Sequence, residues 1–133
     1  MQRNSVNKVL LVGRTGSDAD VRYTTKGMAI ATISVATTET RKDGKGEFQD
    51  VAEWHRVVIF GKMAEFTENY VKKGALIYVE GRLQTRSWDD KEEKRHFMTE
   101  IVADKLTMLG GWKKGAEKDA AVAVAEAEEE VPF

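Results

Sequence analysis

The stretch VAEWHRVVIFG, residues 51–61, is rich in β-branched and aromatic residues and predicts a β-strand. Successive side chains of a strand point to opposite faces, and neighbours on one face stand about 7 Å apart at a rise of ~3.3 Å per residue. One face therefore carries two aromatic rings and a cation in line with a valine: Trp54, Arg56, Val58 and Phe60. The opposite face carries Glu53, His55, Val57 and Ile59.

Four more segments have strand patterns: residues 6–13, 28–39, 75–88 and 96–109. Residues 62–74 (KMAEFTENYVKKG) predict one helix, with Lys72 and Lys73 near its C-terminus and Gly74 as its C-cap. Residues 40–50 (TRKDGKGEFQD) predict a long hairpin loop. Three strands, a helix and two strands is the order of the OB-fold, a five-stranded Greek-key barrel. The expected class is therefore all-β with one short helix.

The strand at residues 75–88 repeats the combination of an aromatic ring with a cation. Ile77, Val79, Gly81 and Leu83 form the expected core face, whereas Arg86 and Trp88 lie on the other face. Exposed indole rings beside arginines suggest a surface on which nucleobases stack, at ~1–3 kcal/mol per base, while cations contact phosphates. The open alternative is that Trp54 and Phe60 belong to the core and that Trp88 closes one end of the barrel.

Composition argues against several other functions. The chain has no cysteine and only two histidines, so disulfides are excluded and a zinc site has few ligands; no metal or cofactor is expected. It lacks the motifs of phosphate loops, zinc proteases and serine hydrolases, so we expect no enzyme. Glu53 and His55 share a face and leave a general-base pair as the weaker alternative to a subunit contact at His55. The short apolar runs and the absence of an export signal predict a cytoplasmic protein without a membrane segment.

The net charge of −1 conceals an uneven distribution along the chain. Residues 116–133 carry a charge of −5, and residues 1–115 carry +4. A basic body of this kind favours a polyanionic partner. We therefore divide the chain into an OB-fold domain (residues 1–111), a short linker (112–127) and an acidic tip (128–133), the last two forming a tail expected to be disordered.

Four segments carry a resemblance to a known family: VNKVLLVGRTGSDADVRY (6–23), AEWHRVVIFGK (52–62), YVKKGALIYVEGRLQTRSW (70–88) and EEEVPF (128–133). They resemble bacterial single-stranded DNA-binding proteins (the SSB family). The resemblance implies a homotetramer that binds single-stranded DNA without sequence preference in replication, recombination and repair, associated with the nucleoid.

The resemblance also assigns roles to individual residues. It implies base stacking by Trp54, Phe60 and Trp88, and tetramer packing at His55. Phosphate contacts are expected from Arg3, Lys8, Arg22, Arg41, Arg56, Lys62, Lys72, Lys73 and Arg86. Recruitment of replication and repair proteins is expected from the tip: Glu128, Glu129, Glu130, Val131, Pro132 and Phe133.

Two departures from the family pattern stand out. The family often has a further stacking tryptophan shortly after the second strand, and here that place falls at Arg41, whose guanidinium plane can also stack on a base. The usual long linker is replaced by about a dozen Ala, Glu, Lys and Val residues. An RNA-binding OB-fold module, a primosome-accessory module and a nuclease using Glu53 and His55 remain the alternatives.

Overall fold

The computed structural model describes residues 3–110 of the chain. The predicted linker and acidic tip lie outside the described residues. Within residues 3–110 no helix is long and apolar enough to cross a membrane.

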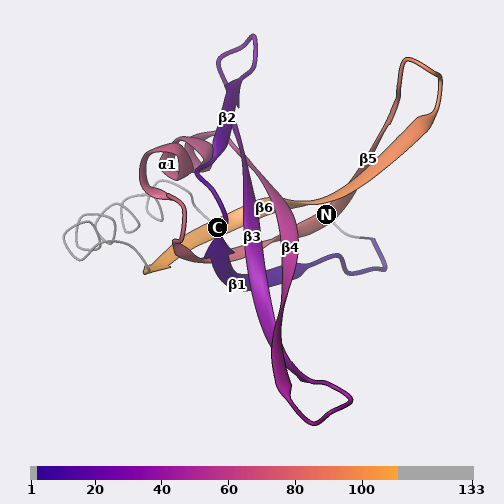
Figure 1. Ribbon diagram of the computed structural model, residues 1–133. Coiled ribbons are helices and arrows are strands. Elements are labelled where there is room, and N and C mark those ends of the chain that lie inside the picture. Colours follow the sequence, from indigo (N-terminus) through magenta and orange to yellow (C-terminus); the bar gives the residue numbers. More distant parts are fainter. Residues whose placement is uncertain (1–2, 111–133) are drawn as a thin grey trace.

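Six strands and one helix follow one another along the chain. They are β1 (Val9–Thr15), β2 (Asp20–Tyr23), β3 (Ala29–Lys42), β4 (Phe48–Phe60), α1 (Lys62–Tyr70), β5 (Leu76–Asp89) and β6 (Arg95–Gly110). The strands lie in the order β1-β5-β6-β4-β3, and β1 pairs back with β3, so five strands close into a barrel (Figure 1). The predicted five-stranded OB-fold barrel with one helix is confirmed.

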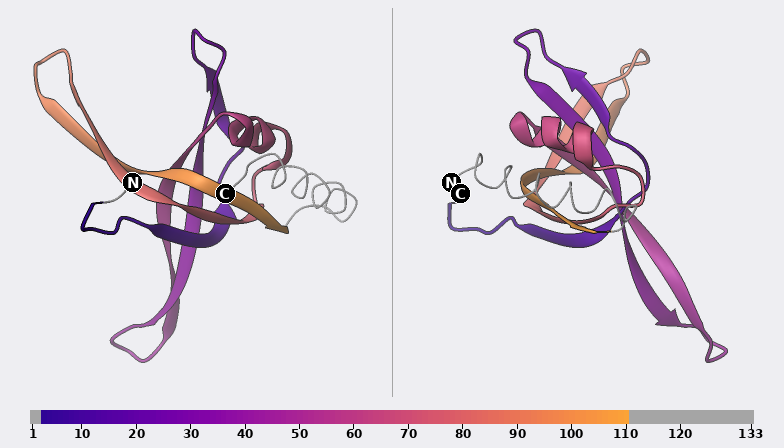
Figure 2. Two further views of the ribbon diagram at one scale, coloured as in Figure 1. Left: turned by 180° about the vertical axis from the view of Figure 1, so that it is seen from behind. Right: turned by 90° about the vertical axis from the view of Figure 1, so that its left-hand side faces the viewer.

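The alternating residues of the long strands fill the barrel. The largest fully buried side chains include Ile33 and Val35 of β3, Ile59 of β4 and Ile77 of β5. Helix α1 lies against the barrel beside β3 and β2 (Figure 2) and adds Ala64 and Phe66 to this core. Burial of these apolar faces fixes which side of each strand is left for solvent.

Two narrow seams close the barrel. β1 joins β3 through Arg14↔Ala36 and Thr15↔Val35, and β4 joins β6 in parallel through Val57↔Ile101 and Val58↔Val102. The backbones approach closely at Gly13, where an added Cβ would stand 2.3 Å from the carbonyl oxygen of Ala36. At Gly81, beside a register shift between β5 and β6, the equivalent distance to the Val102 carbonyl oxygen is 2.2 Å. Only glycine fits at these two positions, the first at the β1–β3 seam and the second in the β5–β6 pairing.

The β3–β4 and β5–β6 hairpins form long arms that project beyond the barrel (Figure 1), and here the structure corrects the sequence prediction. The predicted loop at residues 40–50 is mostly strand: β3 runs to Lys42, β4 begins at Phe48, and only residues 43–47 turn. The β5–β6 arm turns in the same way. In each turn one aspartate, Asp43 or Asp90, accepts two backbone N–H bonds at 2.8 and 2.9 Å.

Two other features differ from the prediction. The short strand β2, which pairs with β3, was not predicted, because it spans only four residues and two of them, Asp20 and Arg22, are charged. Helix α1 ends at Tyr70 with Val71 as its C-cap, and Gly74 instead turns the chain toward β5 at φ 86°. Lys72 still satisfies the helix end, because its Nζ donates to the Glu68 carbonyl at 2.8 Å.

Candidate nucleic-acid interface

The outer face of β4 presents aromatic rings to solvent. The side chains alternate as predicted: Val57 and Ile59 are fully buried, whereas Trp54 is 60% and Phe60 42% exposed. The alternative that Trp54 and Phe60 are core residues is therefore wrong. Val58, on the same outer face as these rings, is nearly buried between the flanking strands.

The indole ring of Trp54 lies against the backbone of Gly16, just after β1. A Cβ added at Gly16 would stand 2.5 Å from Cζ3 and 2.7 Å from Cη2 of this ring. Because Gly16 has no side chain, the ring can settle on the main chain while it stays exposed. Gly16 thus limits the positions that Trp54 can adopt.

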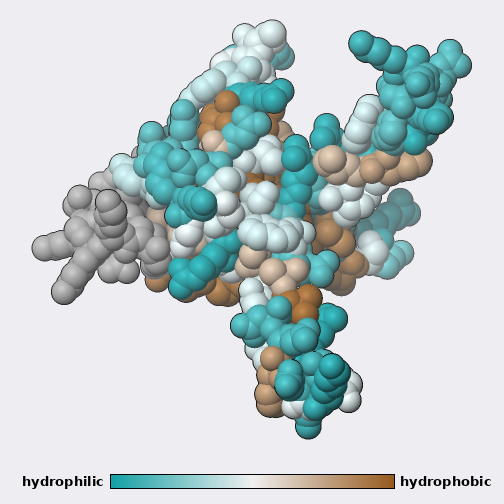
Figure 3. All heavy atoms as spheres, viewed as in Figure 1, coloured by the Kyte–Doolittle hydropathy of each residue, from teal (hydrophilic) through white to brown (hydrophobic). Residues whose placement is uncertain are grey.

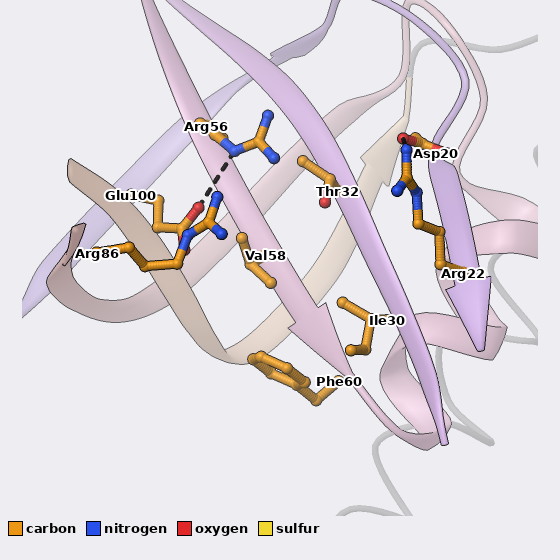
Figure 4. A pocket seen from close by; sticks show the side chains of 9 residues that line it. All are labelled: Asp20, Arg22, Ile30, Thr32, Arg56, Val58, Phe60, Arg86 and Glu100. Atoms are coloured by element: carbon orange, nitrogen blue, oxygen red, sulfur yellow. Dashed lines mark hydrogen bonds and ion pairs between the residues drawn. The ribbon is translucent and has the colours of Figure 1, made fainter. Parts of the chain in front are cut away.

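An open pocket of about 350 Å³ lies beside Phe60 on the outer face of the sheet (Figure 4). Its walls hold three of the predicted phosphate-binding cations, Arg22 from β2, Arg56 from β4 and Arg86 from β5. The remaining lining residues are apolar, polar or acidic: Asp20, Ile30, Thr32, Val58, Phe60 and Glu100. A second, smaller hollow beside Trp54 shares Arg56 and Glu100 with this pocket. Trp54, Phe60 and the three arginines therefore border one continuous surface.

A carboxylate joins two of these arginines. Glu100 of β6 is only 6% exposed, and its Oε2 lies 3.2 Å from Nε of Arg56. Its Oε1 lies 2.9 Å from Nε of Arg86 (Figure 4 draws all three side chains). One acid between two guanidinium groups leaves the cluster with a net positive charge.

Trp88 extends the surface onto the β5–β6 arm. The guanidinium carbon of Arg86 lies 5.6 Å from the centre of its ring, and His96 stacks on it with ring centres 5.6 Å apart. His96 Nε2 lies 2.7 Å from Oδ2 of Asp90, and this hydrogen bond lowers the pKa of the Asp90 carboxyl below its usual value. The ring of Trp88 thus contacts both a cation and an imidazole that is itself hydrogen-bonded.

The other predicted cations are exposed but more scattered. Lys8 lies 3.7 Å from Glu80 at the β1–β5 pairing, and Arg41 lies 3.2 Å from Glu39 on the arm. Arg41 pairs with Gln49, so it occupies the face of the β3–β4 ribbon opposite Trp54. The remaining four are exposed at the N-terminal segment and around α1: Arg3, Lys62, Lys72 and Lys73.

The structure gives little support to the alternative of a catalytic pair. His55 is half-buried and its Nε2 lies 2.9 Å from Oγ1 of Thr37, while Glu53 is exposed. Among residues 3–110 no group of three or more His, Asp or Glu side chains is placed to hold a metal ion.

Sequence reasoning missed four residues of this surface: Gly16, Glu100, His96 and Phe48. Glu100 directly precedes the core residue Ile101, so it lies on the opposite, outer face of β6 beside the arginines of neighbouring strands. Phe48 is 73% exposed and shares the face of β4 that carries Trp54 and Phe60. The partners of Gly16 and His96 depend on strand crossings and hairpin register, which no local pattern indicates.

An OB-fold barrel with exposed rings and arginines on one face defines the class of single-strand nucleic-acid-binding modules. The chain belongs to the single-strand binding protein family, whose model matches residues 6–109. It is 46% identical over 110 residues to single-stranded DNA-binding proteins of Xylella fastidiosa and Xanthomonas campestris. Each match covers 83% of this chain and, respectively, 67% and 64% of the relative.

A solved structure supports the same relationship. The Plasmodium falciparum SSB in complex with ssDNA is similar to this fold with a TM-score of 0.74 and 32% identity. The similarity covers 82% of this chain and 99% of that one.

The Gly16–Trp54 contact can be tested by the substitution Gly16→Ala. The new methyl group and the indole ring cannot both keep their positions, and the ring, as the end of a side chain, moves more easily than the backbone. We expect unchanged far-ultraviolet circular dichroism but altered near-ultraviolet bands and tryptophan emission. Gly44→Ala is the control, because an added Cβ there meets nothing within 4 Å. Identical tryptophan spectra in the two variants would contradict the contact.

Proposed function

We propose that this protein is a non-catalytic binder of single-stranded DNA that protects exposed strands in replication, recombination and repair. The observation that carries this proposal is the exposure of Trp54 and Phe60 on β4 around a pocket lined by three arginines. Large aromatic surface is costly to leave in water, and a ligand with flat apolar faces and a regular negative charge fits this surface best. In this proposal the protein acts in the cytoplasm, associated with the nucleoid DNA.

The binding mechanism combines two kinds of contact. Bases stack on Trp54, Phe60 and Trp88, which discriminates little between sequences because every base has a π-face. Phosphates meet Arg22, Arg56 and Arg86 and release their counterions, so affinity falls as salt rises. A duplex keeps its base faces stacked on one another, and therefore competes poorly for this surface.

Trp54→Ala tests the stacking contact. Removing the indole should cost ~1–3 kcal/mol of binding free energy for each contact, because the base then lies against water. Titration of a labelled oligo-dT, followed by fluorescence anisotropy at low and high salt, measures this loss. Duplex DNA serves as the control ligand, and competition with oligo-U tests preference for RNA. A loss below a few tenths of a kcal/mol would remove Trp54 from the binding surface.

We further propose that four copies assemble into a homotetramer. The outer face of β1 exposes Leu10 by 60% and Val12 by 54%, beside Tyr78 of β5. Hydrophobic atoms reach the surface along the edge of the barrel where β1 runs (Figure 3). Contact between copies would remove these side chains from water. His55, half-buried with Thr37, is proposed for a second contact between subunits.

Sedimentation equilibrium tests the assembly. The expected mass is four times the 14.9 kDa of the chain. Replacing Leu10 and Val12 with serine should lower that mass while the circular dichroism stays that of a folded barrel. A monomeric mass for the unaltered chain would contradict the tetramer.

The acidic tip, residues 128–133, supplies the proposed contact with replication and repair proteins. Its glutamates suit a basic rim on a partner, and the ring of Phe133 suits an apolar pocket. In the free protein the same negative charge competes with DNA for the basic body.

Deletion of residues 128–133 tests this role. We expect single-stranded DNA affinity equal to or higher than that of the full chain, together with loss of captured replication and repair proteins in pull-downs from a bacterial lysate. Deletion of six linker residues, 119–124, is the control for chain length. Undiminished capture by the chain without its tip would rule out this recruitment contact.

A further inference from the structure

Attraction between a cationic surface and DNA does not explain the acid, Glu100, that lies between two arginines of the pocket. Glu100 lies on the outer face of β6, flanked by the strands that carry Arg56 and Arg86. Its negative charge repels a phosphate that approaches the pocket. A buried carboxylate also carries a desolvation cost that only well-placed partners offset. Its position between two of the pocket's arginines therefore calls for a function.

The contacts suggest that function. Glu100 meets both guanidinium groups at Nε, at 3.2 Å for Arg56 and 2.9 Å for Arg86, and both converge on it from different strands (Figure 4). An arginine side chain normally loses rotational freedom when it binds a phosphate. Here one carboxylate fixes two arginines side by side before the ligand arrives, although their like charges would otherwise drive them apart.

The arrangement also reaches the arm. Arg86 contacts Glu100, and its guanidinium carbon lies 5.6 Å from the centre of the Trp88 ring. Fixing Arg86 therefore also fixes the cation beside this ring. Through Arg86, Glu100 therefore links the proposed phosphate site to the proposed base-stacking ring of Trp88.

We propose that Glu100 is a positioning residue for DNA binding, which holds Arg56 and Arg86 as a preformed phosphate site and reduces the dependence of affinity on salt. The proposal rests on the single-stranded DNA binding proposed above. Glu100 has two opposed effects: it lowers the local positive potential, and it places the arginines. Salt screens the first effect over a Debye length of ~10 Å at 0.1 M, whereas positioning persists at any salt concentration.

The variant Glu100→Gln separates these effects, because it removes the charge and keeps nearly the same shape. Short labelled oligo-dT is titrated by anisotropy between about 0.1 and 1 M NaCl. One more uncompensated cation should steepen the slope of log affinity against log salt by about 0.7 per site. At about 0.1 M NaCl the variant should therefore bind oligo-dT at least as tightly as the native chain. By about 1 M NaCl the ratio of its affinity to the native affinity should fall about fivefold, which leaves the variant the weaker binder.

Asp104→Asn is the matched control. Asp104 also lies on β6 and pairs with an arginine of β5, Arg82, at 3.3 Å, but both side chains are about half exposed. The charge change is the same as in Glu100→Gln. An effect of charge alone is screened at high salt, so we expect Asp104→Asn to match the native affinity at about 1 M NaCl. If Glu100→Gln also matches the native affinity at about 1 M NaCl, Glu100 contributes charge alone and the proposal is wrong.

Glu100→Asp provides a second test that does not depend on Glu100→Gln being folded. It keeps the charge but shortens the reach to the arginines by one methylene group. Positioning predicts the native salt slope with about threefold to tenfold weaker binding throughout. Native affinity in a folded Glu100→Asp protein would overturn the proposal.

A measurement without DNA separates this proposal from the function on which it rests. In nuclear magnetic resonance spectra the Nε–H signals of Arg56 and Arg86 should exchange slowly in the native chain and in Asp104→Asn, and quickly in Glu100→Gln. Fast exchange in the native chain would refute the preformed site. Failure of the native chain to bind oligo-dT would instead refute the proposed function.

Discussion

The pairing of β4 with β3 and β6 decides which of its side chains face water. Val57 and Ile59 are committed to the core, so Trp54, Arg56 and Phe60 have no inward alternative. A slip of one residue would exchange the two faces and bury the aromatic–arginine set. The closed barrel makes that slip costly, because β4 is held between two neighbours. The proposed binding surface is thus a consequence of core packing and needs no separate stabilisation.

Positive charge on this surface is paired rather than concentrated. Arg22 lies 3.7 Å from Asp20, and Arg56 and Arg86 share Glu100. Exposed pairs of the first kind contribute little to stability and yield easily to a competing phosphate. The buried Glu100 differs, because loss of its two arginine partners would leave its negative charge unpaired in a site that water reaches poorly. A phosphate can therefore displace Asp20 from Arg22, whereas Arg56 and Arg86 keep their contacts with Glu100.

Much of the architecture could be predicted from local patterns. The alternation along residues 51–61 identified the exposed rings, and the order of strands and helix identified the barrel. The arms could not be predicted in the same way. DGKGE reads as a turn, yet the strands continue to within a residue of it, because cross-strand pairs order a ribbon that has no buried face. Contacts between distant segments, such as Gly16 with Trp54 and Glu100 with two arginines, arise only when the barrel closes.

The two arms differ from the barrel in what supports them. Each is a two-stranded ribbon with water on both sides, whereas the barrel behind it is packed on every inner face. Bending such a ribbon displaces no core side chain, so it deforms at much lower cost than the barrel. Trp88 and Phe48 lie on these flexible arms, whereas Trp54 and Phe60 lie on the part of β4 that belongs to the rigid barrel. The aromatic surface therefore has a fixed centre on the barrel and movable edges on the arms. Such a surface suits a flexible polymer that follows a different curve in each complex.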